Sequence, residues 1–190
     1  MRYDPGKHHR RSIRLKGYDY TRAGAYFITV VTRDRVCLFG EVVDGEMRLN
    51  PFGEIVAESW RWLATQYDYV ELDAWVVMPN HLHGIIVITD GRGGLQTAPT
   101  AMQTAPAMKR KPIGRLIGAF KTVSTKRINE HRGTPNAPVW QRNYYEHIIR
   151  NEESLNRIRQ YIADNPLRWH LDRENVLASG ADPMDAEWFG

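Results

Sequence analysis

The stretch AWVVMPNHLHGIIVIT, residues 74–89, constrains the fold more than any other part of this chain. It predicts two apolar strands joined by a turn at residues 78–80. Side chains alternate faces along a strand, so His81 and His83 leave one face together while Leu82 points to the other. The second strand is apolar on both faces, which is typical of a central strand covered on both sides. Two imidazoles at the start of such a strand are a candidate metal site, although the same spacing also occurs in half-exposed polar pairs.

The length and the cysteine content narrow the class of protein. A chain of 190 residues is long enough for one domain with a proper core. Cys37 is the only cysteine, so an internal disulfide and a cysteine-rich zinc site are excluded. The sequence contains no run of about eighteen apolar residues, so we expect no membrane span. The N-terminus also lacks the apolar core of a signal peptide. We therefore expect a cytoplasmic protein.

The positive charge gathers in two blocks, one before residue 36 and one over residues 109–132. Such blocks favour a polyanionic partner, most simply nucleic acid, over a merely solvated basic surface. The residues that we expect to contact DNA are Arg10, Arg11, Arg14 and Lys16 in the N-terminal arm and Lys109, Arg110, Lys111, Arg115, Lys121, Lys126 and Arg127 in the second block.

Hydrophobic periodicity and turn residues predict the order of the elements. We expect a strand over 26–32, a hairpin over 37–49 turning at Asp44-Gly45, a helix over 51–66, strands over 69–77 and 81–89, a helix over 112–130, an extended strand over 139–150, and a helix that Asn151 caps and Pro166 ends.

This order favours an α+β sandwich of ferredoxin-like type, with a central antiparallel sheet and flanking helices. We expect a single domain over residues 1–170 with a basic arm at 1–17. The Gly, Ala, Thr and Pro content of residues 90–108 predicts a flexible insertion. We expect residues 171–190 to form a C-terminal tail.

The last predicted helix offers further groups for the site. Tyr161 and Asn165 are one turn apart and share a face at the flank of the apolar stripe, where we expect half-buried side chains. Tyr161 can supply a phenolic oxygen and Asn165 an amide oxygen. Each also has an ordinary interpretation, as a tyrosine at the rim of the core and as a residue that ends the helix before Pro166.

Five stretches together resemble one protein family. Residues 75–83, WVVMPNHLH, are similar to the HUH motif of single-strand DNA transposases with one catalytic tyrosine. Residues 11–20, 24–29, 139–151 and 161–166 resemble, in the same order, motifs of the subgroup called REP-associated tyrosine transposases. The resemblance covers most of the chain from residue 11 to residue 169 and leaves out the insertion. It implies a fold of the HUH nuclease type.

The resemblance implies roles for four residues. His81 and His83 become metal ligands, Tyr161 becomes the nucleophile, and Asn165 takes the place of a glutamine that completes the metal site in related transposases. The implied metal is Mg²⁺ or Mn²⁺, and the implied substrate is a single-stranded DNA hairpin from a repetitive extragenic palindrome. The enzyme would cleave and rejoin this DNA through a 5′-phosphotyrosine link. Family members work as dimers, so a homodimer is a further expectation.

Elementary chemistry agrees with these roles. A divalent ion on the histidines would neutralise a scissile phosphate. A phenol with a pKa near 10 is about one part in a thousand ionised at neutral pH, a gap of roughly 4 kcal/mol that a nearby cation can offset. Tyr144 and Tyr145 are rival nucleophiles near His147, but neighbours on a strand face opposite ways, so at most one can face the site.

Two other functions stay open on sequence alone. A non-catalytic DNA-binding protein, such as a domesticated transposase, would keep the fold and bind DNA without a covalent link. A metal-dependent hydrolase of small molecules would use the His-x-His pair but would leave the basic blocks unexplained.

Overall fold

The computed structural model describes residues 18–90 and 110–183. The predicted N-terminal arm and nearly all of the predicted insertion lie outside these residues, and so do Arg10, Arg11, Arg14, Lys16 and Lys109. Within the two described ranges, none of the helices combines the length and the apolar character needed to cross a bilayer. In chain order the elements are β1 (Gly24–Val31), a 3₁₀ helix (Arg33–Arg35), β2 (Gly40–Val43), β3 (Glu46–Leu49), α1 (Pro51–Gln66), β4 (Val70–Val77), β5 (His81–Ile88), α2 (Ile113–Arg132), β6 (Tyr145–Ile149), α3 (Glu152–Asp164) and a second 3₁₀ helix (Trp169–Leu171).

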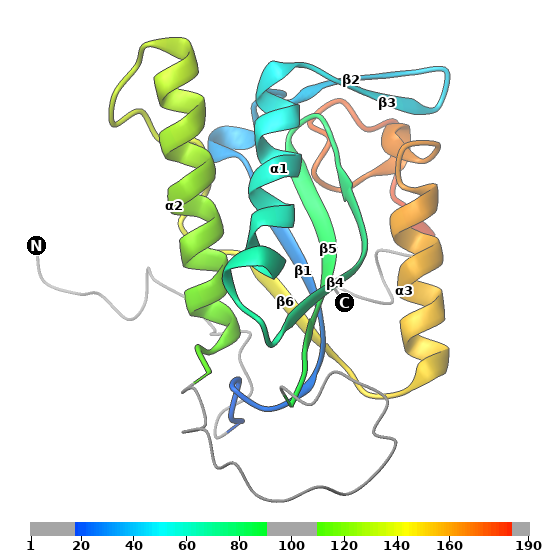
Figure 1. Cartoon of the computed structure of the whole chain (residues 1–190). Helices are drawn as coiled ribbons and strands as arrows, with labels where there is room; N and C mark the ends of the chain where they lie inside the picture. The colour runs from blue at the N-terminus through cyan, green and yellow to red at the C-terminus, as the bar shows by residue number, and fades with distance from the viewer. Residues whose placement is uncertain (1–17, 91–109, 184–190) are drawn as a thin grey trace, which may run out of the picture.

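Four of the strands form one antiparallel sheet in the order β4-β5-β1-β6. The connection from β1 to β4 contains α1, and the connection from β5 to β6 contains α2. In both cases another strand lies between the two that are connected, which is the split βαβ arrangement of ferredoxin-like folds. The predicted fold class is therefore confirmed. The β2-β3 hairpin is an addition between β1 and α1 (Figure 1).

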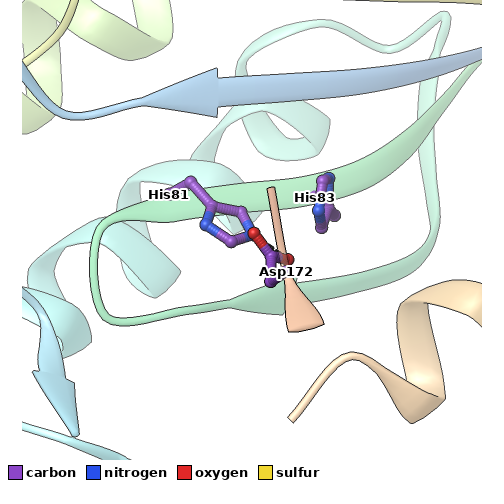
Figure 2. A group of neighbouring side chains, drawn as sticks. All are labelled: His81, His83 and Asp172. Carbon is purple, nitrogen blue, oxygen red and sulfur yellow. Dashed lines mark ion pairs between the residues drawn. The ribbon is translucent and has the colours of Figure 1, made fainter. Parts of the chain in front are cut away.

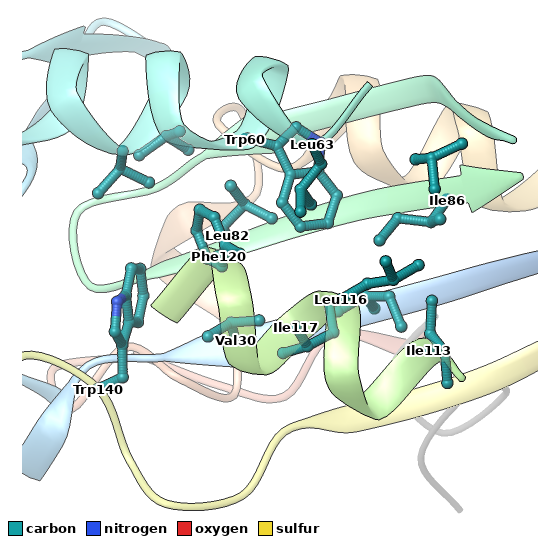
Figure 3. Packing of buried hydrophobic residues seen from close by; sticks show 14 of the residues in the cluster. Val30, Trp60, Leu63, Leu82, Ile86, Ile113, Leu116, Ile117, Phe120 and Trp140 are labelled. Atoms are coloured by element: carbon teal, nitrogen blue, oxygen red, sulfur yellow. The ribbon is translucent and has the colours of Figure 1, made fainter. Parts of the chain in front are cut away.

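The helices divide between the two faces of the sheet. Helices α1 and α2 lie side by side over one face, and α3 lies on the other side of the sheet (Figure 1). Leu82 and Ile86 of β5 point toward α1 and α2, where they meet Trp60 and Phe120 in the larger hydrophobic cluster (Figure 3). The Trp60 and Phe120 rings pack edge to face with centroids 5.2 Å apart. This core fixes the position of β5, which carries the histidine pair.

Local signals set the boundaries of the elements as the sequence predicts. The Asn50 side chain accepts hydrogen bonds from two N–H groups in the first turn of α1, and the Asn151 side chain accepts one from Ser154 in α3. Asp44 and Gly45 both have positive φ, at 54° and 78°, as a type I′ turn requires.

One predicted element is wrong in extent. The extended strand expected over 139–150 is instead an isolated bridge between Trp140 and Thr32, followed by β6 from Tyr145. The chain leaves the sheet between these points, and the Lys121 ammonium there donates hydrogen bonds to the carbonyls of Gln141 at 2.9 Å and Asn143 at 2.7 Å.

Candidate active site

Strand β5 carries the two histidines into the space between the sheet and α3. Their ring centroids are 4.4 Å apart and both side chains are buried, while Leu82 points to the opposite face. The predicted common face of the pair is confirmed. The sequence did not show how each ring is held, and neighbouring side chains decide that.

The ring of His81 is oriented by Asn80, the residue before it in the turn. The Asn80 amide nitrogen donates to the backbone carbonyls of Arg35 at 3.1 Å and Glu174 at 2.7 Å, which leaves the amide oxygen facing His81 Nδ1 at 2.9 Å. An oxygen in this position accepts a hydrogen bond, so Nδ1 carries the proton of the neutral ring. The Nε2 lone pair of His81 therefore points away from the turn and into the site.

The ring of His83 is held in a similar way from β1. Thr29 is the direct partner of His83 in the register of β1 and β5, and its hydroxyl lies 2.8 Å from His83 Nδ1. Phe27, two residues earlier on β1, stacks on the same ring with centroids 5.4 Å apart. Both histidines thus use Nδ1 for the protein and present Nε2 to the interior of the site.

Asp172 is the acidic member of the cluster. It follows the second 3₁₀ helix, and its Oδ2 lies 3.6 Å from His81 Nε2 (Figure 2). Among the described residues, His81, His83 and Asp172 offer three ligand atoms that all lie within 4.8 Å of one another. Sequence reasoning missed Asp172, because it lies in the polar stretch after Trp169, which has no periodicity to mark it.

Other bonds hold Asp172 in place. Its Oδ1 accepts from the backbone N–H of Glu174 at 2.7 Å. The Glu174 carboxylate in turn accepts from Arg35 Nε at 2.8 Å, and its backbone carbonyl accepts from Asn80. Residues 172–174 are thereby fastened to the turn that carries His81, although the sequence placed them in a C-terminal tail.

The contact between His81 and Asp172 calls for a cation. Burial lowers the pKa of His81 although the charges of Asp172 and Glu174 and the nearby Asn165 side chain all favour the protonated ring. The ring is therefore neutral at pH 7, and its Nε2 lone pair faces a carboxylate at a distance too long for a hydrogen bond. Burial lowers the pKa of His83 well below its ordinary value, and the nearby Arg173 charge lowers it further. Two neutral imidazoles and a carboxylate suit a divalent ion.

Asn165 supplies a fourth oxygen at the same place. Its amide nitrogen donates to Asp172 Oδ2 at 3.0 Å, and its Oδ1 is buried without a hydrogen-bond partner, as is His81 Nε2. An unpartnered buried oxygen and an unpartnered ring nitrogen in one site fit a bound cation. The role of Asn165 as a metal ligand stays a prediction that this geometry supports.

Tyr161 reaches the site from α3, the helix that packs against β4 and β6. Its hydroxyl lies 3.4 Å from His83 Nε2, on the side of the ring that Thr29 leaves open. We expected half-buried side chains at the flank of α3, but Tyr161 and Asn165 are 1% and 2% exposed. The reason is that Tyr161 packs on the Phe27 and His83 rings of the sheet, with centroids 6.0 and 5.2 Å away, and that Asp172 lies against the Asn165 amide.

The rival tyrosines separate as strand alternation predicts. Tyr145 packs with Phe27 on the histidine face of the sheet. The Tyr144 hydroxyl donates to Glu146 at 2.7 Å on the opposite face. The Tyr161 hydroxyl, 3.4 Å from His83 Nε2, lies beside the histidine pair.

The described basic residues predicted to contact DNA have different surroundings. Arg110 pairs with Asp90 at 2.9 Å, and the Lys111 ammonium lies over the Tyr67 ring. Lys121 is bound to backbone carbonyls, and burial lowers its pKa to about 8. Lys126 lies 3.8 Å from Glu130 on the exposed side of α2. Arg115 is exposed and Arg127 is half-buried on the same helix.

Comparison with solved structures identifies the class of fold. The structure of a REP-associated tyrosine transposase bound to a REP hairpin matches over 84% of this chain and 74% of that chain, with a TM-score of 0.54 and 20% sequence identity. At this identity the match shows the fold. The chain has the HUH transposase fold, and the histidine pair, Asp172, Asn165 and Tyr161 lie together within it.

Comparison of sequences identifies the family. An uncharacterized protein of Haemophilus influenzae is 41% identical over 175 residues, which are 90% of this chain and 96% of that protein. This chain belongs to the same family. A second Haemophilus influenzae protein, which bears the provisional name REP-associated tyrosine transposase, is 22% identical over 153 residues, or 79% of this chain and 74% of that protein. The resemblance to REP-associated tyrosine transposases is thus confirmed in sequence and in fold. No family model matches the chain.

Proposed function

We propose that this protein is a metal-dependent, single-stranded DNA transposase that cleaves and rejoins strands at palindromic hairpins. The observation that carries the proposal is the meeting of Tyr161 with the histidine pair, its hydroxyl 3.4 Å from His83 Nε2. Two segments 78 residues apart in the chain supply these groups. The REP hairpin in the related solved structure supports DNA as the substrate.

The proposed reaction is an in-line attack on a phosphodiester. The Tyr161 oxygen forms a bond to phosphorus, the bond from phosphorus to the 3′ oxygen breaks, the phenol releases its proton to solvent, and the 3′ oxygen takes one up. The products are a 5′-phosphotyrosine and a free 3′-hydroxyl, so the reverse attack can join another strand. A divalent ion, when bound, supplies charge neutralisation at a non-bridging phosphate oxygen.

The residues of this chain prepare that reaction. Asn80 and Thr29 hold the two rings with Nε2 directed at one point, and His81, His83, Asp172 and Asn165 would hold Mg²⁺ or Mn²⁺ there. Oxygen ligands and bound phosphate favour these hard ions, and Mn²⁺ also accepts imidazole. Because Tyr161 is 1% exposed, part of its surroundings must move before DNA can reach its hydroxyl.

One assay tests the proposal. The full chain is incubated with Mn²⁺ and an end-labelled stem-loop that has single-stranded extensions, and protein-linked DNA is sought on a denaturing gel. The wild type should form an adduct, Tyr161→Phe should form none while binding the stem-loop normally, and Tyr145→Phe is the matched control that should retain the adduct. An adduct that persists in Tyr161→Phe would exclude Tyr161 as the nucleophile.

A second candidate is a DNA-binding protein that keeps the fold without cleaving DNA. The burial of Tyr161 and the histidines favours it, because a protein that does not cleave DNA has no need to admit DNA to these residues. It predicts stem-loop binding by the wild type with no adduct at any Mn²⁺ concentration.

Two further expectations stay predictions. Tyr161 lies beside the histidines of its own chain, so the proposed chemistry needs no tyrosine from another subunit, and a homodimer is to be checked by light scattering. The expected domain end at residue 170 can be checked by truncation there, which would remove Asp172 and expose His81.

A further inference from the structure

A groove of about 770 Å³ lies between the second half of α2 and the loop over residues 133–142. It is on the side of the sheet that α2 covers, and therefore on the face opposite Tyr161. Its volume is within the range of ligand sites in proteins. We propose that this groove binds a single-stranded stretch of the DNA substrate, outside the cleavage centre. This inference rests on the proposed function only in taking the ligand of the groove to be the single-stranded DNA of the substrate.

The walls of the groove are held by hydrogen bonds between side chains and backbone. The Asn129 amide donates to the carbonyl of Ala137 at 2.9 Å, and Asn129 also accepts through its own backbone from Thr134. Trp140 Nε1 donates to the hydroxyl of Ser124 at 2.9 Å, which joins the loop to α2. Lys121 binds the loop just beyond, at Gln141. A groove built in this way exists before a ligand arrives, which lowers the entropic cost of binding.

The chemistry of the lining suits a nucleic-acid strand. Lys126 and Arg142 are exposed at the groove and can reach phosphates, and Glu130 is the one acid among the described residues that line it. Lys126 and Glu130 are 3.8 Å apart with side chains 75% and 62% exposed, so their pairing is weak and leaves Lys126 available.

Other residues that line the groove are apolar. Pro135 and Pro138 are exposed there, the mostly buried Trp140 also lines the groove, and the Asn136 side chain adds an amide donor and acceptor. Bases present apolar faces and hydrogen-bonding edges on a chain of phosphates, which matches this combination. An acidic peptide would satisfy the cations but would leave the apolar part of the lining uncovered.

The groove is placed so that one strand can extend from the cleavage centre to it. The N–H of Gln141 donates to the carbonyl of Val31 at 2.9 Å, and Val31 is the direct partner of His81 in the register of β1 and β5. Neighbouring strands are about 4.8 Å apart. The loop that lines the groove therefore lies at the same end of the sheet as His81, so a strand leaving the histidines can pass this end and enter the groove.

The test compares two double variants of the full chain that each reverse two positive charges. Lys126→Glu with Arg142→Glu alters the groove, and Arg48→Glu with Arg61→Glu, on β3 and α1, is the matched control. The probes are one stem-loop with a single-stranded oligothymidine extension and the same stem-loop without it. Circular dichroism checks that both variants fold.

The groove variant should bind the extended stem-loop at least about tenfold more weakly, and the slope of log affinity against log salt should become shallower by about 1.4, for two phosphate contacts to a single strand. The blunt stem-loop should show little difference between the two variants. A halogenated uracil in the extension should cross-link, on irradiation, to a peptide that contains Trp140.

Equal losses in the two variants, equal losses with both probes, or a cross-link outside residues 121–142 would overturn the inference. Binding of an oligoglutamate peptide that is as strong as binding of the extended DNA, and that is lost in the groove variant, would also overturn it in favour of a protein partner. The adduct assay is read separately. An adduct at Tyr161 with an unaffected groove variant leaves the proposed function standing, whereas groove-dependent binding without any adduct contradicts the proposed chemistry alone.

Discussion

The two faces of the sheet in this protein are built for different purposes. The face under α1 and α2 carries a large hydrophobic cluster whose members, such as Trp60 and Phe120, interdigitate (Figure 3). The face under α3 has a smaller cluster around Phe27, Ile85 and Ile158, and beside it lie the buried polar groups of the site. One face supplies most of the apolar burial that stabilises the fold, and the other gives part of its interior to buried polar side chains.

The comparison shows how the fold can contain a site whose burial lowers the free energy of unfolding. Burying His81 Nε2 and Asn165 Oδ1 without hydrogen-bond partners costs free energy. The opposite face of the sheet can offset that cost because β5 contributes to both faces. Its Leu82 side chain lies in the large cluster, and the adjacent His81 and His83 lie in the site. The two faces should therefore respond differently to substitution, to metal and to pH.

The largest effect on stability is expected on the α1 and α2 face. Phe120→Ala should lower the free energy of unfolding by about 3–5 kcal/mol, because Phe120 is fully buried and its ring contacts Trp60 and Trp140. Urea denaturation in EDTA measures it. The stabilisation by Mn²⁺ should be unchanged in this variant, and a loss of both would contradict the division between the faces.

The next effect belongs to the site. Mn²⁺ at a hundred times its dissociation constant should raise the free energy of unfolding by about 2.7 kcal/mol, since it binds the folded state. His81→Ala should remove this gain, whereas His147→Ala, an imidazole on β6 outside the cluster, should retain it. Thermal unfolding with and without Mn²⁺ measures the difference, and an equal gain in all three proteins would exclude the proposed metal site.

A third prediction concerns pH in the absence of metal. Burial lowers the pKa values of His81 and His83 in the folded protein, while the unfolded chain takes up protons near pH 6.5. Stability is thus fully present above pH 6.5 and is lost as the pH falls below it, by up to about 1.4 kcal/mol per pH unit for each imidazole.

Urea denaturation in EDTA between pH 7.5 and pH 5 measures this slope. The slope should flatten in the double variant His81→Ala with His83→Ala. Phe120→Ala, on the opposite face, should keep the wild-type slope at a lower stability. A slope that does not depend on the two histidines would show that they titrate normally.

The smallest effect is expected at the outer edge of α3. The Arg159 guanidinium donates two hydrogen bonds to the Asp73 carboxylate of β4, at 2.9 and 2.6 Å, and holds the pKa of that carboxyl below its ordinary value. Because the Arg159 side chain is 43% exposed, a double-mutant cycle of Arg159→Ala and Asp73→Ala should give a coupling of about 0.5–1 kcal/mol. If this pair positions α3, each single variant should also slow adduct formation.

Much of the frame of the site follows from local sequence patterns. Strand alternation correctly predicts that the histidines share a face and that Tyr144 and Tyr145 do not. The asparagine cap correctly predicts the start of α3, and helical spacing puts Tyr161 and Asn165 on one side of it. The extent of β6 was wrong: the chain leaves the sheet between the Trp140 bridge and Tyr145, where the Lys121 ammonium binds the carbonyls of Gln141 and Asn143, 20 and 22 positions away.

The sequence by itself determined the faces of the strands and the ends of the helices, since these depend on backbone geometry that repeats within a few residues. Only the tertiary structure decided that Asp172 joins the histidines, that Asn80 and Thr29 set their rings, and that Tyr161 is sealed beside them. Those relations join segments that are distant in the chain, and their distances result from the packing of the whole domain, which no local pattern records.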